Sequence, residues 1–235
     1  MSGIIAEKYW HIGNHQYAFY RHSLESACKD RYGGRILDAG CGQLISSLSR
    51  VPEGSEFVGV DVDRQALIQS KKEAKGKYEY VLASLNALPF KTKIFSLVVS
   101  IDVLEHIQDK AGVVKEISRI IASKGFFIGS TTNMLNPFMF VDALFPPQFL
   151  ARFEGIAGKH CDRHKRLTMK SLTRLANKSG FTCKLSIYGF PPIQPWIYHH
   201  RNKKLTWYAR LWILFDRLAP TSVKENMVFI ARKNS

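Results

Sequence analysis

Short apolar runs alternate with longer amphipathic stretches along the first half of the chain. The runs have the length of strands, and the stretches between them have the apolar spacing of helices. The run FSLVVS at 95–100 is apolar almost throughout, which is typical of a strand buried on both faces. Strands are therefore predicted at 35–38, 56–61, 78–82, 95–100 and 125–130, with helices at 43–51, 64–75 and 103–121 between them.

The alternation stops near residue 133, and an irregular segment with three prolines follows over 134–166. A helix is then predicted over 168–179, with a threonine as N-cap and a glycine after its end. Two further strands are predicted at 181–188 and 226–232. Strands that alternate with helices predict an α/β fold, here a doubly wound, seven-stranded and mostly parallel sheet.

The length of 235 residues fits one domain with several parts. We expect an N-terminal helical cover at 1–32 and a cofactor-binding core at 33–133. A substrate-side segment at 134–166 follows, and a basic, aromatic insertion at 189–225 separates the last two strands.

The net charge of +15 is concentrated in the second half of the chain. Residues 1–132 hold 17 Lys and Arg against 14 Asp and Glu, whereas residues 133–235 hold 17 against 5. This one-sided excess predicts an anionic partner on the side that carries it. The four cysteines form no CxxC pair, and we see neither a signal peptide nor an apolar run of about 18–20 residues, so a cytoplasmic location is expected.

A glycine turn, Gly40-Cys41-Gly42, follows the first predicted strand, and Asp61 ends the second strand about twenty residues later. A strand, a glycine turn and a helix are the parts with which α/β sheets bind nucleotide-like ligands. A carboxylate at the position of Asp61 is typical of one that binds ribose hydroxyls. These features alone fit NAD as well as other cofactors.

Asp38 separates the candidate cofactors, because it lies two residues before the first glycine of the turn. The pyrophosphate of a dinucleotide would be repelled by a carboxylate at this place. S-adenosylmethionine instead brings an ammonium and a sulfonium, which carboxylates attract. Ile45 also stands where a dinucleotide motif has its third glycine. The turn therefore favours S-adenosylmethionine over NAD.

The segment ILDAGCG at 36–42 resembles the first motif of class I S-adenosylmethionine-dependent methyltransferases, and FVGVD at 57–61 resembles their second-strand motif. Later segments are similar to those of the small-molecule branch of this family, the type 11 or ubiquinone-biosynthesis-like branch. These segments are 88–90, 95–100, 103–107, 116–121, 124–125, 130–133 and 167–181. The resemblance covers about residues 30–190, with the motifs in the family's order.

The resemblance implies a Rossmann-like fold and roles for particular residues. Asp38 and the backbone of Gly40, Cys41 and Gly42 would hold the methionine end of S-adenosylmethionine, and Asp61 would bind its ribose. Other contacts with the cofactor are implied for Val62, Ser84, Leu85 and Ile101, and Arg21 is a candidate partner of its carboxylate.

The sequence departs from the family pattern at two places. Leu44 replaces a glycine, and Ser84 replaces an aspartate that accepts a hydrogen bond from the adenine amino group. A neutral serine accepts that bond more weakly than a carboxylate does.

Histidines are the candidate acceptor-side residues. His106 would face the acceptor near the transferred methyl group, as a base or as a positioning group. His160 and His164 lie in the substrate-side segment and are candidates for binding the acceptor. Neither they nor the pair His11 and His15 come with the glutamate or the cysteine pair of a zinc site, so no metal is expected.

The function predicted from the sequence is methyl transfer from S-adenosylmethionine to a small or lipid-like, anionic acceptor, with oxygen as the acceptor atom. Residues 190–224 combine three tryptophans with basic side chains, so they are a candidate for peripheral membrane contact, packing over the sheet or contact with a second subunit. Two alternatives stay open: an RNA methyltransferase, favoured by charge but by no recognisable RNA-binding module, and a methyltransferase-like binding protein without catalysis. The acceptor's identity and the oligomeric state are left open.

Overall fold

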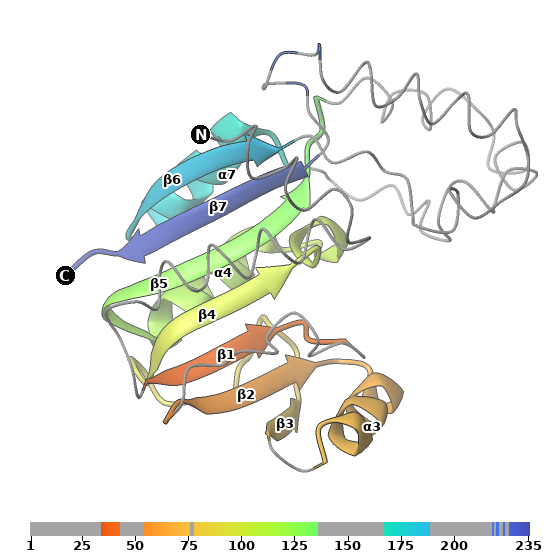
Figure 1. Ribbon diagram of the computed structural model, residues 1–235. Helices are drawn as coiled ribbons and strands as arrows, with labels where there is room; N and C mark the ends of the chain where they lie inside the picture. The colour runs from red at the N-terminus through yellow and green to blue at the C-terminus, as the bar shows by residue number, and fades with distance from the viewer. Residues whose placement is uncertain are drawn as a thin grey trace, which may run out of the picture.

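This computed structural model describes residues 34–42, 54–75, 78–135, 167–188, 218, 220, 223 and 226–235. The described strands form one seven-stranded sheet in the order β3-β2-β1-β4-β5-β7-β6 (Figure 1). Strands β1 to β5 are parallel, and β7 runs antiparallel to both of its neighbours. The strands are β1 Arg35–Ala39, β2 Glu56–Asp61, β3 Glu79–Leu82, β4 Phe95–Ile101, β5 Ile121–Thr132, β6 Phe181–Tyr188 and β7 Asn226–Lys233.

This architecture confirms the predicted α/β class and the predicted seven-stranded, mostly parallel sheet. Strand β4 is buried on both faces over most of its length, as its apolar sequence predicted. Strand β1 lies between β2, which follows it in the sequence, and β4, which the chain reaches only after β2 and β3. The strand order thus reverses between β1 and β4, and ligands of doubly wound sheets bind outside the carboxyl ends of the strands at such a point.

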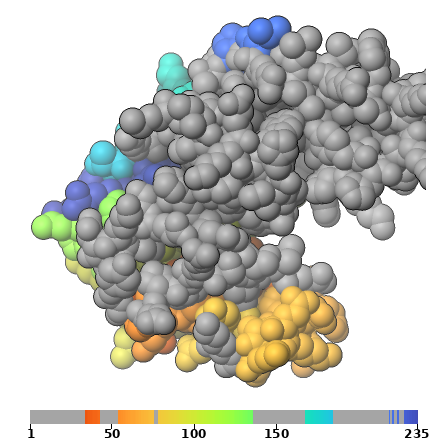
Figure 2. Space-filling view, in the orientation of Figure 1, coloured from red at the N-terminus to blue at the C-terminus, as the bar shows by residue number. Residues whose placement is uncertain are grey.

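Three α-helices lie in the described residues: α3 Arg64–Glu73, α4 Lys110–Ile120 and α7 Met169–Lys178. Helix α7 begins with the predicted N-cap, because Thr168 and Ser171 form a reciprocal capping box. Helices α4 and α7 cover one face of the sheet (Figure 1), and α3 lies at the surface at the β3 end of the sheet (Figure 2).

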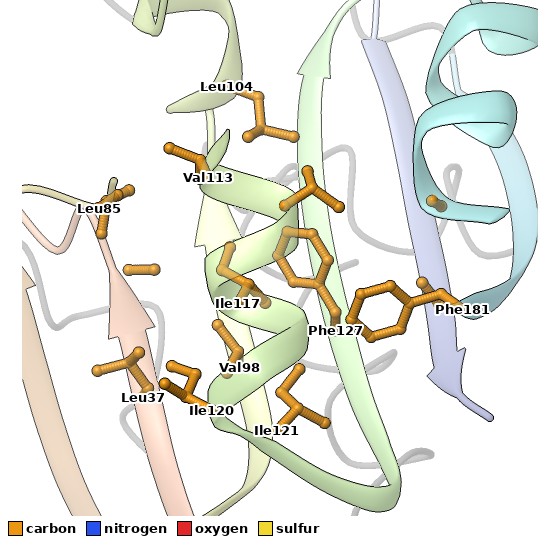
Figure 3. Packing of buried hydrophobic residues seen from close by; sticks show 14 of the residues in the cluster. Leu37, Leu85, Val98, Leu104, Val113, Ile117, Ile120, Ile121, Phe127 and Phe181 are labelled. Carbon is orange, nitrogen blue, oxygen red and sulfur yellow. The ribbon is translucent and has the colours of Figure 1, made fainter. Parts of the chain in front are cut away.

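The main hydrophobic core lies between the sheet and helix α4 (Figure 3). The helix points Val113, Ile117 and Ile120 at the sheet, a spacing of three and four residues that puts them on one face. Phe127 from β5 packs edge-on against Phe229 from β7, with ring centroids 4.8 Å apart. A second cluster on the other face joins Ile36, Phe57, Leu97, Val99 and Ile128.

The predicted helix over 103–121 is wrong in its extent. A 3-10 turn, η3 Leu104–His106, is followed by extended backbone at Ile107, and α4 begins only after Asp109. The reason is local: the Asp109 carboxylate accepts a hydrogen bond from the Gly112 amide at 2.8 Å and starts a new helix there. Strand β5 then begins at Ile121, four residues earlier than predicted.

Several predicted parts lie outside the described residues. They are the helical cover at 1–32, the helix at 43–51, most of the segment at 134–166 and nearly all of the insertion at 189–225. The division of the chain into these parts stays a prediction. Among the helices in the described ranges, none is long and apolar enough to cross a membrane.

Candidate cofactor and acceptor site

The glycine turn after β1 is tied to the carboxyl end of β2. The amides of Gly40 and Cys41 both donate to the Val60 carbonyl, at 2.8 and 3.0 Å. The Asp61 carboxylate accepts from the Gly42 amide at 2.8 Å through one oxygen and from the Asp63 amide at 2.9 Å through the other. This carboxylate therefore fixes the shape of the turn, besides being available to a ligand at its half-buried edge.

The two glycines of the turn serve different purposes. Gly40 has a φ of +84°, and a Cβ there would lie 2.5 Å from a methyl group of Val103. Gly42 has a φ of +52°, but a Cβ there would meet nothing within 4 Å. Gly40 thus lets the turn pack against the segment after β4, whereas Gly42 leaves its backbone open to a ligand.

Asp38 is buried directly beneath this turn, with 4% of its surface exposed. Burial, and to a smaller degree the charge of Asp61, raise the pKa of the Asp38 carboxyl from 3.8 to about 7. A cation placed beside it would favour the ionised form and relieve both effects. Two carboxylates at one glycine turn therefore match a cationic ligand and oppose a phosphate.

Two apolar side chains lie exposed beside Asp61. Val62 follows Asp61 in the chain and is 70% exposed. Leu82, which pairs with Asp61 from the neighbouring strand β3, is 54% exposed. Such exposed apolar side chains, next to a carboxylate that is predicted to bind a ribose, suit a flat, apolar ring such as adenine. Val62 was a predicted contact residue, and this role stays a prediction. Leu82 was not named from the sequence, where its only signal is that it ends the strand paired with β2.

The loop after β3 is held against helix α4. The Arg119 guanidinium donates to the carbonyls of Leu88 and Phe90 at 3.1 and 2.7 Å and pairs with Glu116 at 2.7 Å. The Glu116 carboxylate also accepts from the Leu88 amide at 2.9 Å. These contacts fix the middle of the loop at 88–90. Ser84, at the start of the loop, is exposed at the same edge of the sheet as Asp61.

The structure brings the described candidates together along the carboxyl edge of β1 to β4. Two of them offer backbone instead of side chain: Cys41 is 5% exposed, and Leu85, 7% exposed, packs in the core (Figure 3). Ile101 ends β4 and is half-buried, and His106 is exposed on η3. Arg21, His160 and His164 lie outside the described residues, and the roles assigned to all of these residues stay predictions.

Comparisons with known proteins agree with this geometry. Residues 37–129 match the family model of a methyltransferase domain. The ubiquinone biosynthesis O-methyltransferase of Nitrosomonas europaea is 28% identical over 149 residues, which cover 62% of this chain and 62% of that protein. A probable S-adenosylmethionine-dependent methyltransferase of Mycobacterium tuberculosis is 28% identical over 134 residues, 55% of this chain and 44% of that protein. The chain thus matches less than two thirds of the length of these relatives.

Solved structures share the fold at low sequence identity. The YcgJ protein of Bacillus subtilis superposes with a TM-score of 0.64 at 14% identity, over 92% of this chain and 99% of that one. Geranyl diphosphate C-methyltransferase of Streptomyces coelicolor gives a TM-score of 0.63 at 15% identity, over 93% of this chain and 79% of that one.

The sheet order and the glycine turn with its two carboxylates define a class I, Rossmann-like methyltransferase fold. Residues 37–129 match the model of a methyltransferase domain, and relatives at 28% identity are named as ubiquinone biosynthesis O-methyltransferase and as a probable S-adenosylmethionine-dependent methyltransferase. The resemblance stated from the sequence is thereby confirmed, and the relatives favour neither an RNA methyltransferase nor a non-catalytic binding protein.

Proposed function

We propose that this protein transfers the methyl group of S-adenosylmethionine to an oxygen atom of a small acceptor. The observation that carries the proposal is the buried Asp38 carboxyl beneath a glycine turn that Asp61 fixes. The negative charge of a carboxylate at this turn would attract the positive ammonium and sulfonium of S-adenosylmethionine. The name of the relatives, ubiquinone biosynthesis O-methyltransferase, supports oxygen as the acceptor atom.

Each described residue then has a task. The bound cofactor supplies a methyl group on a positively charged sulfur, which is a strong electrophile. Asp38 and the Gly42 backbone hold the methionine end, and Asp61 holds the ribose between exposed Val62 and Leu82. His106, exposed on η3, takes the proton that the acceptor hydroxyl loses as its oxygen gains the methyl group.

The first experiment measures cofactor binding. Isothermal titration calorimetry with S-adenosylhomocysteine is expected to show one site per chain, and NAD is expected to give no heat. A wild-type protein that ignores S-adenosylhomocysteine, or that binds NAD instead, would overturn the proposal.

The second experiment identifies the acceptor class. Phenolic acids with and without a prenyl chain are incubated with S-adenosylmethionine carrying a labelled methyl group, and labelled products are separated by mass spectrometry. The excess of basic residues after position 132 supports an anionic acceptor. Turnover restricted to neutral acceptors would contradict that part of the proposal.

Peripheral membrane contact is proposed for residues 190–224, from the tryptophans and basic residues of their sequence. Nearly all of this segment lies outside the described residues. Flotation with vesicles that contain an anionic lipid tests it, with neutral vesicles as the control. Equal recovery with both kinds of vesicle would contradict an electrostatic contact.

A further inference from the structure

The short turn η3 connects three environments within a few residues. Val103, just before it, packs against the glycine turn at Gly40. Leu104 is fully buried in the core, whereas His106, the proposed base, is exposed. A movement of this turn would therefore change the cofactor side and the acceptor side together.

Between Leu104 and His106, the turn places a carboxyl group in the interior. Glu105 is 7% exposed, and its Oε2 has no hydrogen-bond partner among the described residues. The hydroxyl of Thr131, from β5, is also buried and lies close enough to this carboxyl to favour its ionised form. Helix α4 contributes Lys110, which is 7% exposed and whose ammonium donates to the Ile107 carbonyl.

Burying the ionisable side chain of Glu105 in the interior lowers the stability of the folded protein when the group is charged. An uncharged side chain of the same size would fill the space without the penalty of burying a charge. Groups retained in this way, next to a binding cleft, are often functional. No described contact gives Glu105 a structural task that requires its charge, such as an ion pair within 4 Å.

We propose that Glu105 is a positioning residue, whose ionised carboxylate is drawn between Lys110 and Thr131 and holds η3 so that Val103 closes on the cofactor turn and His106 points to the acceptor. The proposal rests on the proposed function, because it assigns the residue to the same site. Glu105 acts through Val103 and His106 and is not placed against either ligand.

The charges that surround Glu105 set the pH range in which this role operates. Asp102, which follows β4, repels the carboxylate, whereas Lys110 of α4 and the Thr131 hydroxyl of β5 favour its charged form. Burial first, and then Asp102, raise the pKa of Glu105 from 4.5 to about 7, against the smaller effects of its own backbone amide, the Thr131 hydroxyl and Lys110. The carboxyl is therefore mostly neutral at pH 6 and mostly ionised at pH 8.

The test compares Glu105→Gln with the wild type in calorimetric titrations with S-adenosylhomocysteine at pH 6, 7 and 8. The amide keeps the shape and removes the charge. We expect equal affinities at pH 6 and about fivefold weaker binding by the variant at pH 8, a size usual for residues that couple to a site without touching its ligand. Titration of Asp38 occurs in both proteins and cancels in the ratio of their affinities.

Thermal unfolding shows whether the variant is folded, and its midpoint at pH 8 is expected to be no lower than that of the wild type, because a buried charge has been removed. Glu73→Gln on the exposed face of α3 is the matched control and should leave the ratio at one. Lys110→Met is a second variant: without the cation, Glu105 ionises less readily, so binding should again weaken at pH 8 and not at pH 6.

Three outcomes decide the proposal. A loss of affinity that grows from pH 6 to pH 8 in both variants supports it. Equal affinities at every pH, or a loss that is the same at every pH, would overturn it, since the charge would then have no role. A wild-type protein that binds no S-adenosylhomocysteine would instead refute the proposed function itself.

Discussion

The Asp61 carboxylate accepts a hydrogen bond from the Gly42 amide at 2.8 Å, across 19 positions of sequence. The bond joins the end of β2 to the end of the glycine turn, while the other carboxylate oxygen holds the Asp63 amide at 2.9 Å. Asp61, which is half-buried, thus shapes the turn, and we predict that it also binds the ribose. A substitution there is expected to damage the site in both ways.

Asp61→Asn is expected to weaken S-adenosylhomocysteine binding by about 10- to 100-fold. The amide keeps one acceptor oxygen, but its NH2 group replaces the other, and hydrogen bonds to a charged partner are worth about 1.5–3 kcal/mol. Calorimetry measures the change. Glu79→Gln, an exposed glutamate at the opposite end of β3, is the control, and equal affinities of Asp61→Asn and wild type would show that the ribose is bound elsewhere.

The two glycines of the turn are expected to respond differently to alanine. Gly40→Ala places a methyl group 2.5 Å from Val103 at a φ of +84°, so the free energy of unfolding should fall by about 2–4 kcal/mol. Gly42→Ala meets no atom within 4 Å and pays only for its φ of +52°, about 1–2 kcal/mol.

Although Gly42→Ala should lose less stability than Gly40→Ala, we expect it to bind the cofactor poorly, because its methyl group occupies the open space over the turn. We expect a folded protein with at least tenfold weaker affinity for S-adenosylhomocysteine. Urea unfolding and calorimetry on the same samples separate the two effects. Wild-type affinity in Gly42→Ala would mean that no ligand approaches this backbone.

The periodicity of the sequence predicted the sheet well, because each strand is a short apolar run between turn residues. The described candidate residues lie at the carboxyl ends of β1 to β4, because residues that follow successive parallel strands meet at one edge of the sheet. The helix predicted at 103–121 failed, since Val103, Leu104 and Ile107 have helical spacing although Asp109 starts a new helix.

Other features depend on contacts that the sequence does not record. Leu85 was expected at the cofactor, but its side chain packs in the core with Leu37 and Val98. Glu105 belongs to a motif that drew attention to His106, yet it is Glu105 that is buried and His106 that is exposed. Which side of a one-turn helix faces the interior is set by the strand and helix packed on it, here β5 and α4.

Stability without cofactor is expected to decrease as the pH rises from about 4 to about 7. Asp38 in the folded protein keeps its proton to about pH 7, whereas in the unfolded chain it loses the proton near its ordinary pKa of 3.8. A folded-state pKa above the unfolded value contributes stability at low pH that is lost as the pH passes through this window. The difference corresponds to at most about 4 kcal/mol.

Asp38→Asn should remove this part of the pH dependence and be more stable than the wild type at pH 8. Urea midpoints at pH 5 and pH 8 measure it. Glu105 contributes a parallel decline in both proteins, so the prediction concerns the difference between them. A decline of the same size in the variant would contradict the assignment to Asp38.

Ser84→Asp is expected to bind S-adenosylhomocysteine about three- to tenfold more tightly than the wild type. Ser84 is exposed after β3, and its hydroxyl accepts from the Asn86 amide at 3.3 Å. An aspartate can make the same bond to the residue two positions on, so the loop that Arg119 latches should keep its shape. The second carboxylate oxygen is then free for the adenine amino group, and a charged acceptor binds a donor more strongly than a hydroxyl does.

Ser84→Ala, which removes the acceptor, should bind more weakly than the wild type. In calorimetry at constant pH and salt, the affinity should rise from the alanine variant through the wild type to the aspartate variant. An aspartate variant that binds no better than alanine would place the adenine ring away from this loop.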